Sequence, residues 1–312
     1  RLARWIKNVY ANSLLTNKRK PEPVPEIVMA IPKLNSYALP AATELPTNKV
    51  KWTVEPQRAA LLIHDMQAYF LNFWGENSPL IDQVVENIAR LRAYCKAQGI
   101  PVFYTAQPNE QSDADRALLN DMWGPGLNKH PDQQKIVDAL APDQDDQVLT
   151  KWRYSAFVRS PLESILQEMG RDQLIITGVY AHIGCLTTAT DAFMRNIQPF
   201  MVADALADFS REEHMMALTY TAGRSGKVVM TADLMPLPLS KDDLRALILP
   251  LLEDDDVPED DENLIDYGLD SVRVMALAAR WRQVHNDIDF VSLAKNPSID
   301  GWWALLSRTP AK

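Results

Sequence analysis

Charged side chains stand directly after two short apolar runs of the sequence. Asp65 closes the run "AALLIHD", and Lys151 and Arg153 follow the run that ends in "VLT". The carboxyl ends of parallel strands meet at one edge of a sheet, and ligands bind there. An acid and cations gathered at that edge suit a small anionic substrate. Burial would raise the pKa of Asp65 and fit it to donate a proton, although a strand-end Asp also serves as a plain cap or turn residue.

Gln107 and Tyr180 lie at or just past the ends of further apolar runs. Arg116 and Trp123 follow in the stretch "TAQPNEQSDADRALLNDMWGPG". Gathered at the same edge, these side chains would add hydrogen-bond donors and a cation to the site. The alternative for Arg116 is an ordinary surface ion pair within an acidic helical stretch.

The elements that must position these residues alternate between short apolar runs and longer amphipathic ones. One amphipathic stretch ends at Gly99, and its apolar residues from Ile81 to Tyr94 recur on a single helical face. This alternation predicts an α/β domain of three layers, a parallel sheet covered by helices on both faces. The expected strands are 59–66, 100–107, 172–179, 199–206 and 227–231, and the expected helices are 80–99, 161–170 and 185–197.

The segment "MPLPLS" at 235–240 interrupts the alternation. The residues after it read as helices without strands, which predicts a small all-α bundle of four helices. Residues 240–312 carry 15 Asp and Glu against 8 Lys and Arg, so this bundle is acidic. The expected organisation is an extension over 1–28, an α/β domain over 29–235, a linker over 236–241 and a helical domain over 242–312.

Composition excludes several classes of protein. The 312 residues, 46% of them hydrophobic, suffice for a large core and a second small domain. The net charge of -9 argues against a nucleic-acid-binding surface, and no apolar run is long enough for a membrane span. Two cysteines give no disulfide framework, which predicts a reducing, cytoplasmic location. The basic stretch at 1–28 is either a segment upstream of a start at Met29 or a membrane-surface helix.

A serine at the start of a helix stands out in the acidic bundle. In "YGLDSVRVMALAARW", Gly268 allows a turn, and Asp270 and Ser271 are both of a type that caps helices. The apolar face is expected to begin with Val272, Met275, Leu277 and Ala278. A cap is the plain interpretation of Ser271, but GxDS in an acidic bundle behind a catalytic-looking domain resembles the phosphopantetheine attachment site of carrier domains.

Longer stretches carry a more specific resemblance. The segments "LLIHDMQAYF", "YTAQP", "ALLNDMWGPGL", "LTKWRYSAF", "LIITGVYAHIGCLTTATDAF" and "VADALADFS" resemble the isochorismatase family. With the carrier-like bundle behind them, the order of domains resembles the bifunctional isochorismate lyase and aryl carrier proteins of catechol siderophore assembly, of the enterobactin and vibriobactin type. The resemblance runs from Met29 to about Arg308.

The resemblance implies two activities. One is hydrolysis of the enolpyruvyl ether of isochorismate to 2,3-dihydro-2,3-dihydroxybenzoate and pyruvate, with Asp65 as the acid, Lys151 orienting it, and no metal. The other is carriage of 2,3-dihydroxybenzoate as a thioester on a 4'-phosphopantetheine arm at Ser271. A cis peptide at Val179–Tyr180 is implied as well. The implied substrate-binding residues are Phe70, Gln107, Arg116, Trp123, Tyr180 and Gly184.

Gly184 and Cys185 bear on the choice of chemistry. The resemblance extends to amidohydrolases such as nicotinamidases, whose Asp–Lys–Cys triad has its nucleophilic cysteine where this chain has Gly184. Cys185 comes one residue later, where its side chain would point in a different direction. The histidine metal ligands of nicotinamidases are also missing from "YTAQPNEQSD". Hydrolysis driven by protonation is therefore the leading function, and a cysteine amidohydrolase or a non-catalytic carrier or scaffold are the alternatives.

The resemblance also implies partners. They are a 2,3-dihydroxybenzoate-AMP ligase, a phosphopantetheinyl transferase, the downstream condensation domain of a nonribosomal peptide synthetase, and a second copy of the chain bound through the isochorismatase domain. Met275 lies one helical turn beyond Ser271, and Phe290 and Ala294 lie four residues apart on the next segment. We expect these three residues to dock the partners. The alternative is that they belong to the core.

Overall fold

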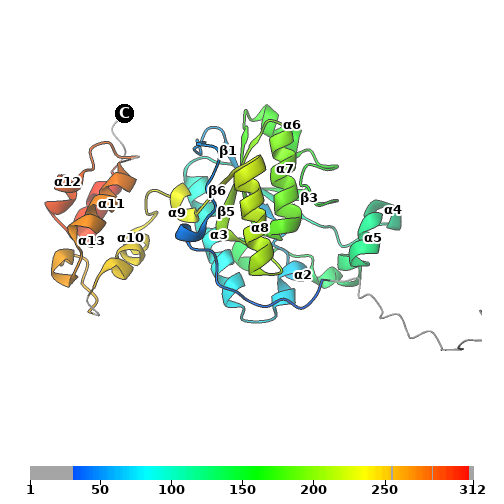
Figure 1. The fold of residues 1–312 in the computed structure, drawn as a ribbon, viewed down its shortest axis with the longest axis horizontal. Helices are drawn as coiled ribbons and strands as arrows, with labels where there is room; N and C mark the ends of the chain where they lie inside the picture. Colours follow the sequence, from blue (N-terminus) through cyan, green and yellow to red (C-terminus); the bar gives the residue numbers. More distant parts are fainter. Residues whose placement is uncertain (1–30, 254–255, 283, 309–312) are drawn as a thin grey trace, which may run out of the picture.

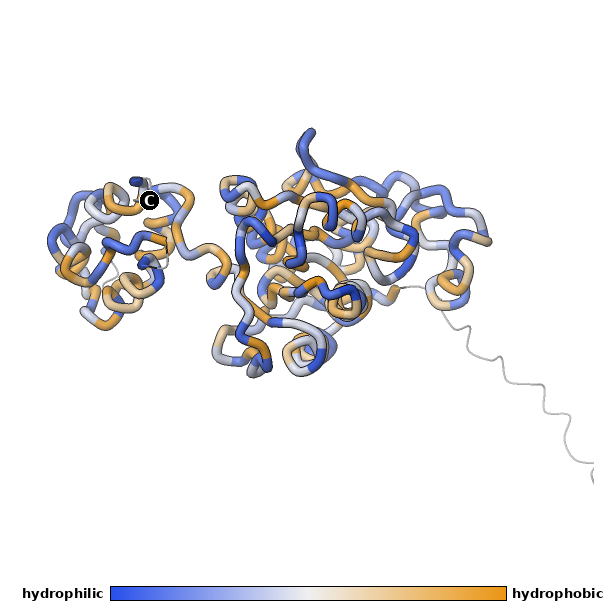
Figure 2. Tube along the Cα trace, turned by 90° about the horizontal axis from the view of Figure 1, so that it is seen from above, coloured by the Kyte–Doolittle hydropathy of each residue, from blue (hydrophilic) through white to orange (hydrophobic). Residues whose placement is uncertain are grey.

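The structure, a computed structural model, describes residues 31–253, 256–282 and 284–308, and the extension expected at 1–28 lies outside them. A larger part with a central sheet and a smaller helical part are joined by one narrow stretch of chain (Figure 1, Figure 2). Each part has its own clusters of buried apolar side chains, two in the larger part and one in the smaller.

Six parallel strands form the sheet, in the order β3-β2-β1-β4-β5-β6. β1 lies inside the sheet, and its residue Ile63 pairs with Tyr104 of β2 on one side and Thr177 of β4 on the other. Every residue of β1 and β4 is buried, as expected for strands covered on both faces. The strands are β1 (Ala59–His64), β2 (Val102–Ala106), β3 (Gln147–Thr150), β4 (Gln173–Val179), β5 (Gln198–Ala207) and β6 (Lys227–Val229).

Helices cover both faces of the sheet (Figure 1). Leu61 and Ile63 point to the face covered by α3, whereas Leu62 points to the face covered by α6, α7 and α8. The expectation of a three-layer α/β domain is therefore confirmed. The covering helices are α3 (Pro79–Ala97), α6 (Leu162–Glu168), α7 (Leu186–Met194) and α8 (Arg211–Tyr220).

Short helices and turns fill the connections, and α4 and α5 stand away from the sheet in Figure 1. The α-helices among them are α2 (Ala68–Leu71), α4 (Asp113–Arg116), α5 (Leu118–Trp123) and α9 (Thr231–Leu234). The 3-10 turns are η1 (Ala42–Glu44), η2 (Asn72–Trp74), η3 (Gly126–Lys129), η4 (Pro131–Gln133) and η5 (Asp138–Leu140). The π-helical turns are η6 (Ala181–Cys185) and η7 (Thr221–Ser225).

The helical part has the four helices that the sequence predicts. Its core contains two fully buried tryptophans, Trp281 and Trp302, whose rings lie 5.6 Å apart in an edge-to-face arrangement. The helices are α10 (Lys241–Ile248), α11 (Ser271–Trp281), α12 (Phe290–Ala294) and α13 (Ile299–Leu306), and the 3-10 turns between them are η8 (Leu249–Leu251) and η9 (Leu264–Tyr267).

The expected apolar face of α11 is wrong in two positions. Val272 is 68% exposed and Met275 is 50% exposed, whereas Leu277 and Ala278 are buried. The buried face consists of Val274, Leu277, Ala278 and Trp281, which follow the i, i+3, i+4, i+7 spacing of a helix. Val272 and Met275 are apolar but lie outside this spacing, so they remain on the surface.

One side chain of the helical part bonds to the end of the larger part. Arg280 of α11 donates hydrogen bonds to the carbonyl oxygens of Ala232 (3.1 Å) and Met235 (2.6 Å). Within the described ranges no helix combines the length and the apolar character that crossing a bilayer requires.

Candidate functional site

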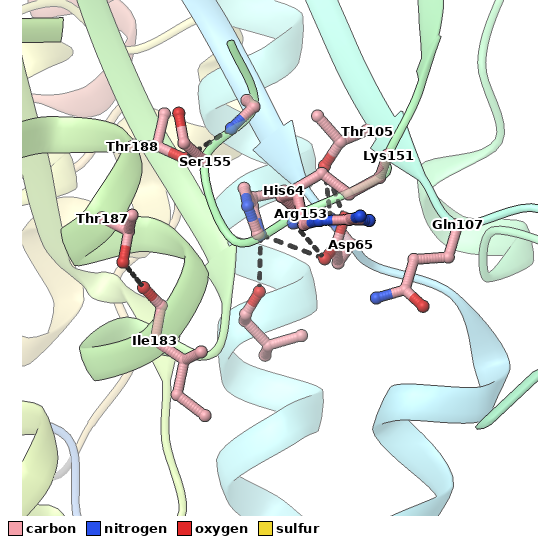
Figure 3. A network of polar contacts seen from close by, with 12 residues as sticks. His64, Asp65, Thr105, Gln107, Lys151, Arg153, Ser155, Ile183, Thr187 and Thr188 are labelled. Carbon is pink, nitrogen blue, oxygen red and sulfur yellow. Dashed lines mark hydrogen bonds and ion pairs between the residues drawn. The ribbon is translucent and has the colours of Figure 1, made fainter. Parts of the chain in front are cut away.

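Asp65 lies at the carboxyl end of β1 and is held by a residue of β2 and by the residue that follows β3. The Thr105 hydroxyl donates to one carboxylate oxygen at 2.6 Å, and the Lys151 ammonium donates to the other at 3.0 Å (Figure 3). Asp65 is 5% exposed and Lys151 is 3% exposed. The backbone of Asp65 has a φ of +52, a left-handed conformation that short polar side chains tolerate best. The strand end therefore presents a buried carboxylate with a fixed direction.

Opposing effects act on the pKa of Asp65. Burial on its own would raise it, but the Lys151 cation and the Thr105 hydroxyl hold the pKa below its ordinary value. His64, whose Nδ1 lies 3.6 Å from the Asp65 carboxylate, would lower it further only if it were protonated. Burial lowers the pKa of His64 to about 4, so at neutral pH Lys151 and Thr105 are the groups that oppose the effect of burial on Asp65. These two contacts favour the ionised form of Asp65 in the free protein.

A cavity surrounds Asp65 and collects all the residues that the sequence assigns to hydrolysis. They come from the ends of β1 to β4, from α2, from the α4–α5 region and from the turn η6. Their burial in one cavity fits a small organic ligand. The predicted residues among its lining are Asp65, Phe70, Gln107, Arg116, Trp123, Lys151, Arg153, Tyr180 and Gly184, and the other lining residues are Ile31, His64, Tyr69, Leu119, Tyr154, Val179, Ile183 and Phe209.

The cavity is rich in cations. Arg116 is 3% exposed, and its Nε donates to the Gly124 carbonyl at 2.6 Å. Its Nη1 is buried and has no hydrogen-bond partner within the part of the chain that the structure describes. Arg153 uses Nη1 to bond the backbone carbonyls of Asp115 and Trp152. Lys151, Arg116 and Arg153 against the single carboxylate of Asp65 favour an anionic ligand, which would give the free guanidinium nitrogen an acceptor.

Aromatic rings form another wall of the cavity. Tyr180 packs edge-on against Phe209 with ring centres 4.8 Å apart, and its hydroxyl donates to the Phe70 carbonyl at 2.8 Å. The indole N–H of Trp123 donates to the Tyr154 hydroxyl at 2.8 Å. The peptide Val179–Tyr180 is cis, as the sequence resemblance implies. These contacts place aromatic side chains in the lining of the same cavity as the cations.

Gly184 and Cys185 are consecutive residues of the turn η6, but their environments differ. Gly184 lines the cavity, whereas Cys185 is fully buried among apolar residues of the α7 face of the sheet. Burial raises the pKa of the Cys185 thiol well above its ordinary value, which opposes formation of a thiolate. The arrangement therefore supports the expectation that Cys185 is a buried structural residue.

His182, in the same turn, is held by the carboxylate of Asp208. Its backbone N–H and its Nδ1 contact the two oxygens of the buried Asp208 carboxylate, at 2.7 Å and 2.5 Å. Burial would lower the pKa of His182, but the hydrogen bond with Asp208 outweighs it and raises the pKa above its usual value. This pair fixes the turn between Tyr180 and Gly184.

No group of three or more His, Cys, Asp or Glu side chains suited to hold a metal occurs among the described residues.

The second candidate site is the start of α11. Asp270, not Ser271, caps this helix, since its carboxylate accepts from the Arg273 N–H at 2.8 Å. Ser271 is the first helical residue, and its side chain is exposed. A free hydroxyl at the N-terminus of an eleven-residue helix fits a phosphoester, because the helix dipole favours negative charge there.

The residues expected to dock partners are all on the surface. Met275 is 50% exposed, Phe290 is 40% exposed, and Ala294 is exposed as well. The alternative that these residues belong to the core is therefore wrong. Their role in docking stays a prediction.

Comparisons with known proteins now carry the assignment. An isochorismatase domain model matches residues 59–233, and a model of the phosphopantetheine attachment site matches 242–306. The chain belongs to the isochorismatase family. Because its second matched domain carries phosphopantetheine, the protein takes a covalent 4'-phosphopantetheine group. The fold with its two domains is that of an isochorismatase followed by a carrier domain.

Two curated relatives match this isochorismatase-family chain over most of its length. It is 73% identical to enterobactin synthase component B of Escherichia coli (strain K12), across 90% of this chain and 99% of the relative. It is 48% identical to an isochorismatase of Bacillus subtilis (strain 168), across 89% of this chain and 96% of the relative. A cysteine hydrolase structure from Pseudomonas syringae pv. phaseolicola 1448A, 24% identical, covers 61% of this chain and 95% of its own with a TM-score of 0.55, and it shows the shared fold alone.

Several residues of the site escape sequence reasoning. Thr105 lies inside β2, yet its hydroxyl reaches Asp65 because β1 and β2 run side by side. Gln67 is fully buried and accepts the backbone N–H of Gln107, which holds that loop against the site. Phe209 lies two residues after β5, which is two strands away from β1 in the sheet, and it still lines the cavity. Of these, Gln67 carries a usable signal, since it is a polar residue two positions after the strand-end acid.

Lys151→Met tests the charge pairing in the site. It keeps the bulk of the side chain but leaves the Asp65 carboxylate buried without a cation, so we expect the free energy of unfolding to fall by about 3–5 kcal/mol at pH 7. In the wild type the lowered pKa of Asp65 contributes stability that is present above its unfolded-state pKa and is lost as the pH falls through the folded-state value. Without Lys151, burial raises this pKa, so the difference between the two proteins should shrink as the pH falls from 7 towards 4.

Urea unfolding at a series of pH values measures this difference. Lys135→Met is the matched control, because Lys135 pairs with Asp138 on the surface and should lose no more than about 1 kcal/mol. A loss for Lys151→Met that does not change with pH would contradict the charge pairing.

Proposed function

We propose that this chain hydrolyses isochorismate to 2,3-dihydro-2,3-dihydroxybenzoate and pyruvate, and carries 2,3-dihydroxybenzoate as a thioester for siderophore assembly. The observation that carries the first activity is the buried Asp65–Lys151 pair in a cavity with two further cations and aromatic walls. Isochorismate has two carboxylates and a planar enolpyruvyl ether, which match cations and flat apolar surfaces. The names of the relatives, an isochorismatase and an enterobactin synthase component, support the same substrate and assembly.

The proposed hydrolysis begins with a proton. Asp65 protonates the methylene carbon of the enolpyruvyl group, and the ether carbon becomes an oxocarbenium ion. Water adds to that carbon and returns a proton to Asp65. The hemiketal then collapses: its hydroxyl proton passes to the oxygen attached to the ring, the bond between that oxygen and the former ether carbon breaks, and pyruvate leaves. Water is consumed, the acid is regenerated, and no covalent bond to the protein forms.

Asp65 must gain a proton before it can act. In the free protein the Lys151 cation keeps its pKa low. A bound substrate places carboxylates near Lys151, Arg116 and Arg153, and so competes for the cation that stabilises the Asp65 carboxylate. Its negative charge and the exclusion of water both raise the pKa of Asp65. The acid is thereby protonated where the substrate is bound.

The carrier activity is proposed to reside on Ser271. When bound there, the phosphopantetheine supplies a thiol that holds the aryl group as a thioester. Ser271 supplies the attachment oxygen and an exposed position from which the arm extends into solvent. The proposed partners are the transferase that attaches the arm, the aryl-adenylating ligase that loads it, and a condensation domain that takes the aryl group.

Further organisation belongs to the same proposal. We propose domain limits of 29–235 and 242–312. Family models that match inside these limits, at 59–233 and 242–306, and the separate cores support the division into two domains. A homodimer through the larger domain is supported by exposed apolar side chains on α5, α7 and α8, namely Leu118, Met122, Met194 and Tyr220. A reducing, cytoplasmic location is supported by the two free, buried cysteines.

Asp65→Asn should abolish pyruvate release from isochorismate, because the amide keeps the shape of the side chain but cannot deliver the proton. We expect a loss of at least about a hundredfold in kcat, the usual contribution of a general acid. Coupled spectroscopic detection of pyruvate measures it. Cys185→Ala is the matched control and should stay active; if it lost activity by orders of magnitude while remaining folded, the non-covalent mechanism would be wrong.

Ser271→Ala should prevent attachment of phosphopantetheine and loading of the aryl group, because the attachment oxygen is removed. Pyruvate release should keep its wild-type rate, since the two parts have separate cores. Intact-protein mass spectrometry after incubation with the transferase measures the attachment. An attached arm in the variant would place the site on another residue.

Met275→Asp should impair transfer to the condensation domain more than loading by the ligase, because it puts a charge on an exposed apolar side chain one turn beyond Ser271. Val257→Asp, at a residue that is 64% exposed outside the proposed docking residues, is the matched control and should affect neither step. Mass spectrometry of the loaded carrier, together with product formation, separates the two steps. An equal loss in both, or a loss of helical signal, would reject Met275 as a docking residue.

A further inference from the structure

His64, the residue before the acid, is enclosed by two glycines. Gly178 pairs with it in the sheet and has a φ of +106, and a Cβ at position 178 would run into the His64 backbone carbonyl. Gly184 faces the imidazole ring, where an added Cβ would lie 2.8 Å from Nε2 and closer still to Cε1. The ring thus fills the volume that any side chain at position 184 would need.

The His64 ring also joins separate parts of the site. Its Nδ1 donates to the carbonyl of Val179, the residue directly before Tyr180, at 2.7 Å. The ring is 1% exposed and lines the same cavity as Asp65 and Gly184. One side chain therefore contacts the end of β4 and the turn η6 while its own backbone carries the acid at the end of β1.

We infer that His64 is a positioning residue, whose ring sets the distance between the Asp65 acid and the wall formed by Val179, Tyr180 and Gly184. The inference rests on the proposed hydrolysis, because positioning has meaning only for an acid that acts on a bound substrate. Two features of the ring contribute: its Nδ1 donor towards Val179, which we expect to carry the larger effect on kcat, and its bulk against Gly184, which we expect to carry a smaller one. A displacement of about 1 Å at such a site costs on the order of a hundredfold in rate.

The donor is tested by two substitutions that divide the properties of the ring. His64→Asn keeps an N–H near the position of Nδ1, whereas His64→Leu keeps apolar bulk and loses the donor. We expect His64→Asn to retain kcat within about fivefold and His64→Leu to lose about tenfold to a hundredfold in kcat with a smaller change in KM. A residue that merely fills space would give the reverse order, and that result would overturn the inference.

The contact with Gly184 is tested by a double-mutant cycle. Gly184→Ala pushes a methyl group into the ring, and His64→Ala removes the ring. We expect each single variant to lower both Tm and kcat/KM, and the double variant to lose at least about tenfold less kcat/KM than the product of the two single losses. Shifts in Tm that simply add, together with losses in kcat/KM that simply multiply, would overturn the inference.

The readouts separate this inference from the proposed function. If the wild type releases no pyruvate from isochorismate, the proposed function fails, while the cycle in Tm still reports whether the ring and position 184 are coupled. A coupling in Tm without any effect of His64→Leu on kcat would leave a packing contact and overturn the positioning role. His285→Leu, at a buried histidine of the helical part, is the control for loss of an imidazole and should leave pyruvate release unchanged.

Discussion

The ion pair between Asp65 and Lys151 constrains most of what surrounds it. Taking a carboxylate and an ammonium out of water costs several kcal/mol for each ion, and the pair recovers this cost only with close contact and further hydrogen bonds. Thr105 supplies one such bond at 2.6 Å, and neighbouring strands supply the rigid backbone. A sheet edge is suited to this task because strands that pair in register fix the distance between the residues that follow them. The Asp65 carboxylate is therefore held by the same strand pairing that holds the sheet together.

Close packing around the acid limits which residues the chain tolerates. Gly178 and Gly184 meet His64 from two sides, so the site depends on two side chains that are absent as much as on those present. The turn that carries Gly184 is fixed in turn by His182 and Asp208. Arg116 depends on a glycine in the same way, since a Cβ at Gly126 would collide with its guanidinium. Close approach of the backbone at these glycines fixes the shape of the pocket in advance, so little reorganisation is needed when a ligand binds.

Much of the fold follows from local patterns in the sequence. The amphipathic helix α3 is long enough for its period to be decisive, and the apolar runs at β1, β2, β4 and β5 are short enough to indicate strands. Asp65 and Lys151 were predictable as strand-end residues, and their meeting follows from parallel pairing. Contacts that depend on tertiary packing were not predictable: Thr105 looks like an ordinary strand residue, and Val272 looks like a core residue. Apolar character alone does not tell a buried face from a docking surface, because both use the same residue types.

The contact that Arg280 makes with the larger domain decides which side of α11 stays accessible. It ties α11 to the carbonyls of Ala232 and Met235, and it lies nine residues after Ser271 on that helix. Nine residues make about two and a half turns, so the two side chains leave the helix on opposite sides. The larger domain thus holds one side of the helical domain, while the exposed Ser271 side chain lies on the opposite side of α11. An arm on Ser271, as proposed above, would leave the helix away from this contact, so a partner enzyme could reach the arm while the contact stays in place.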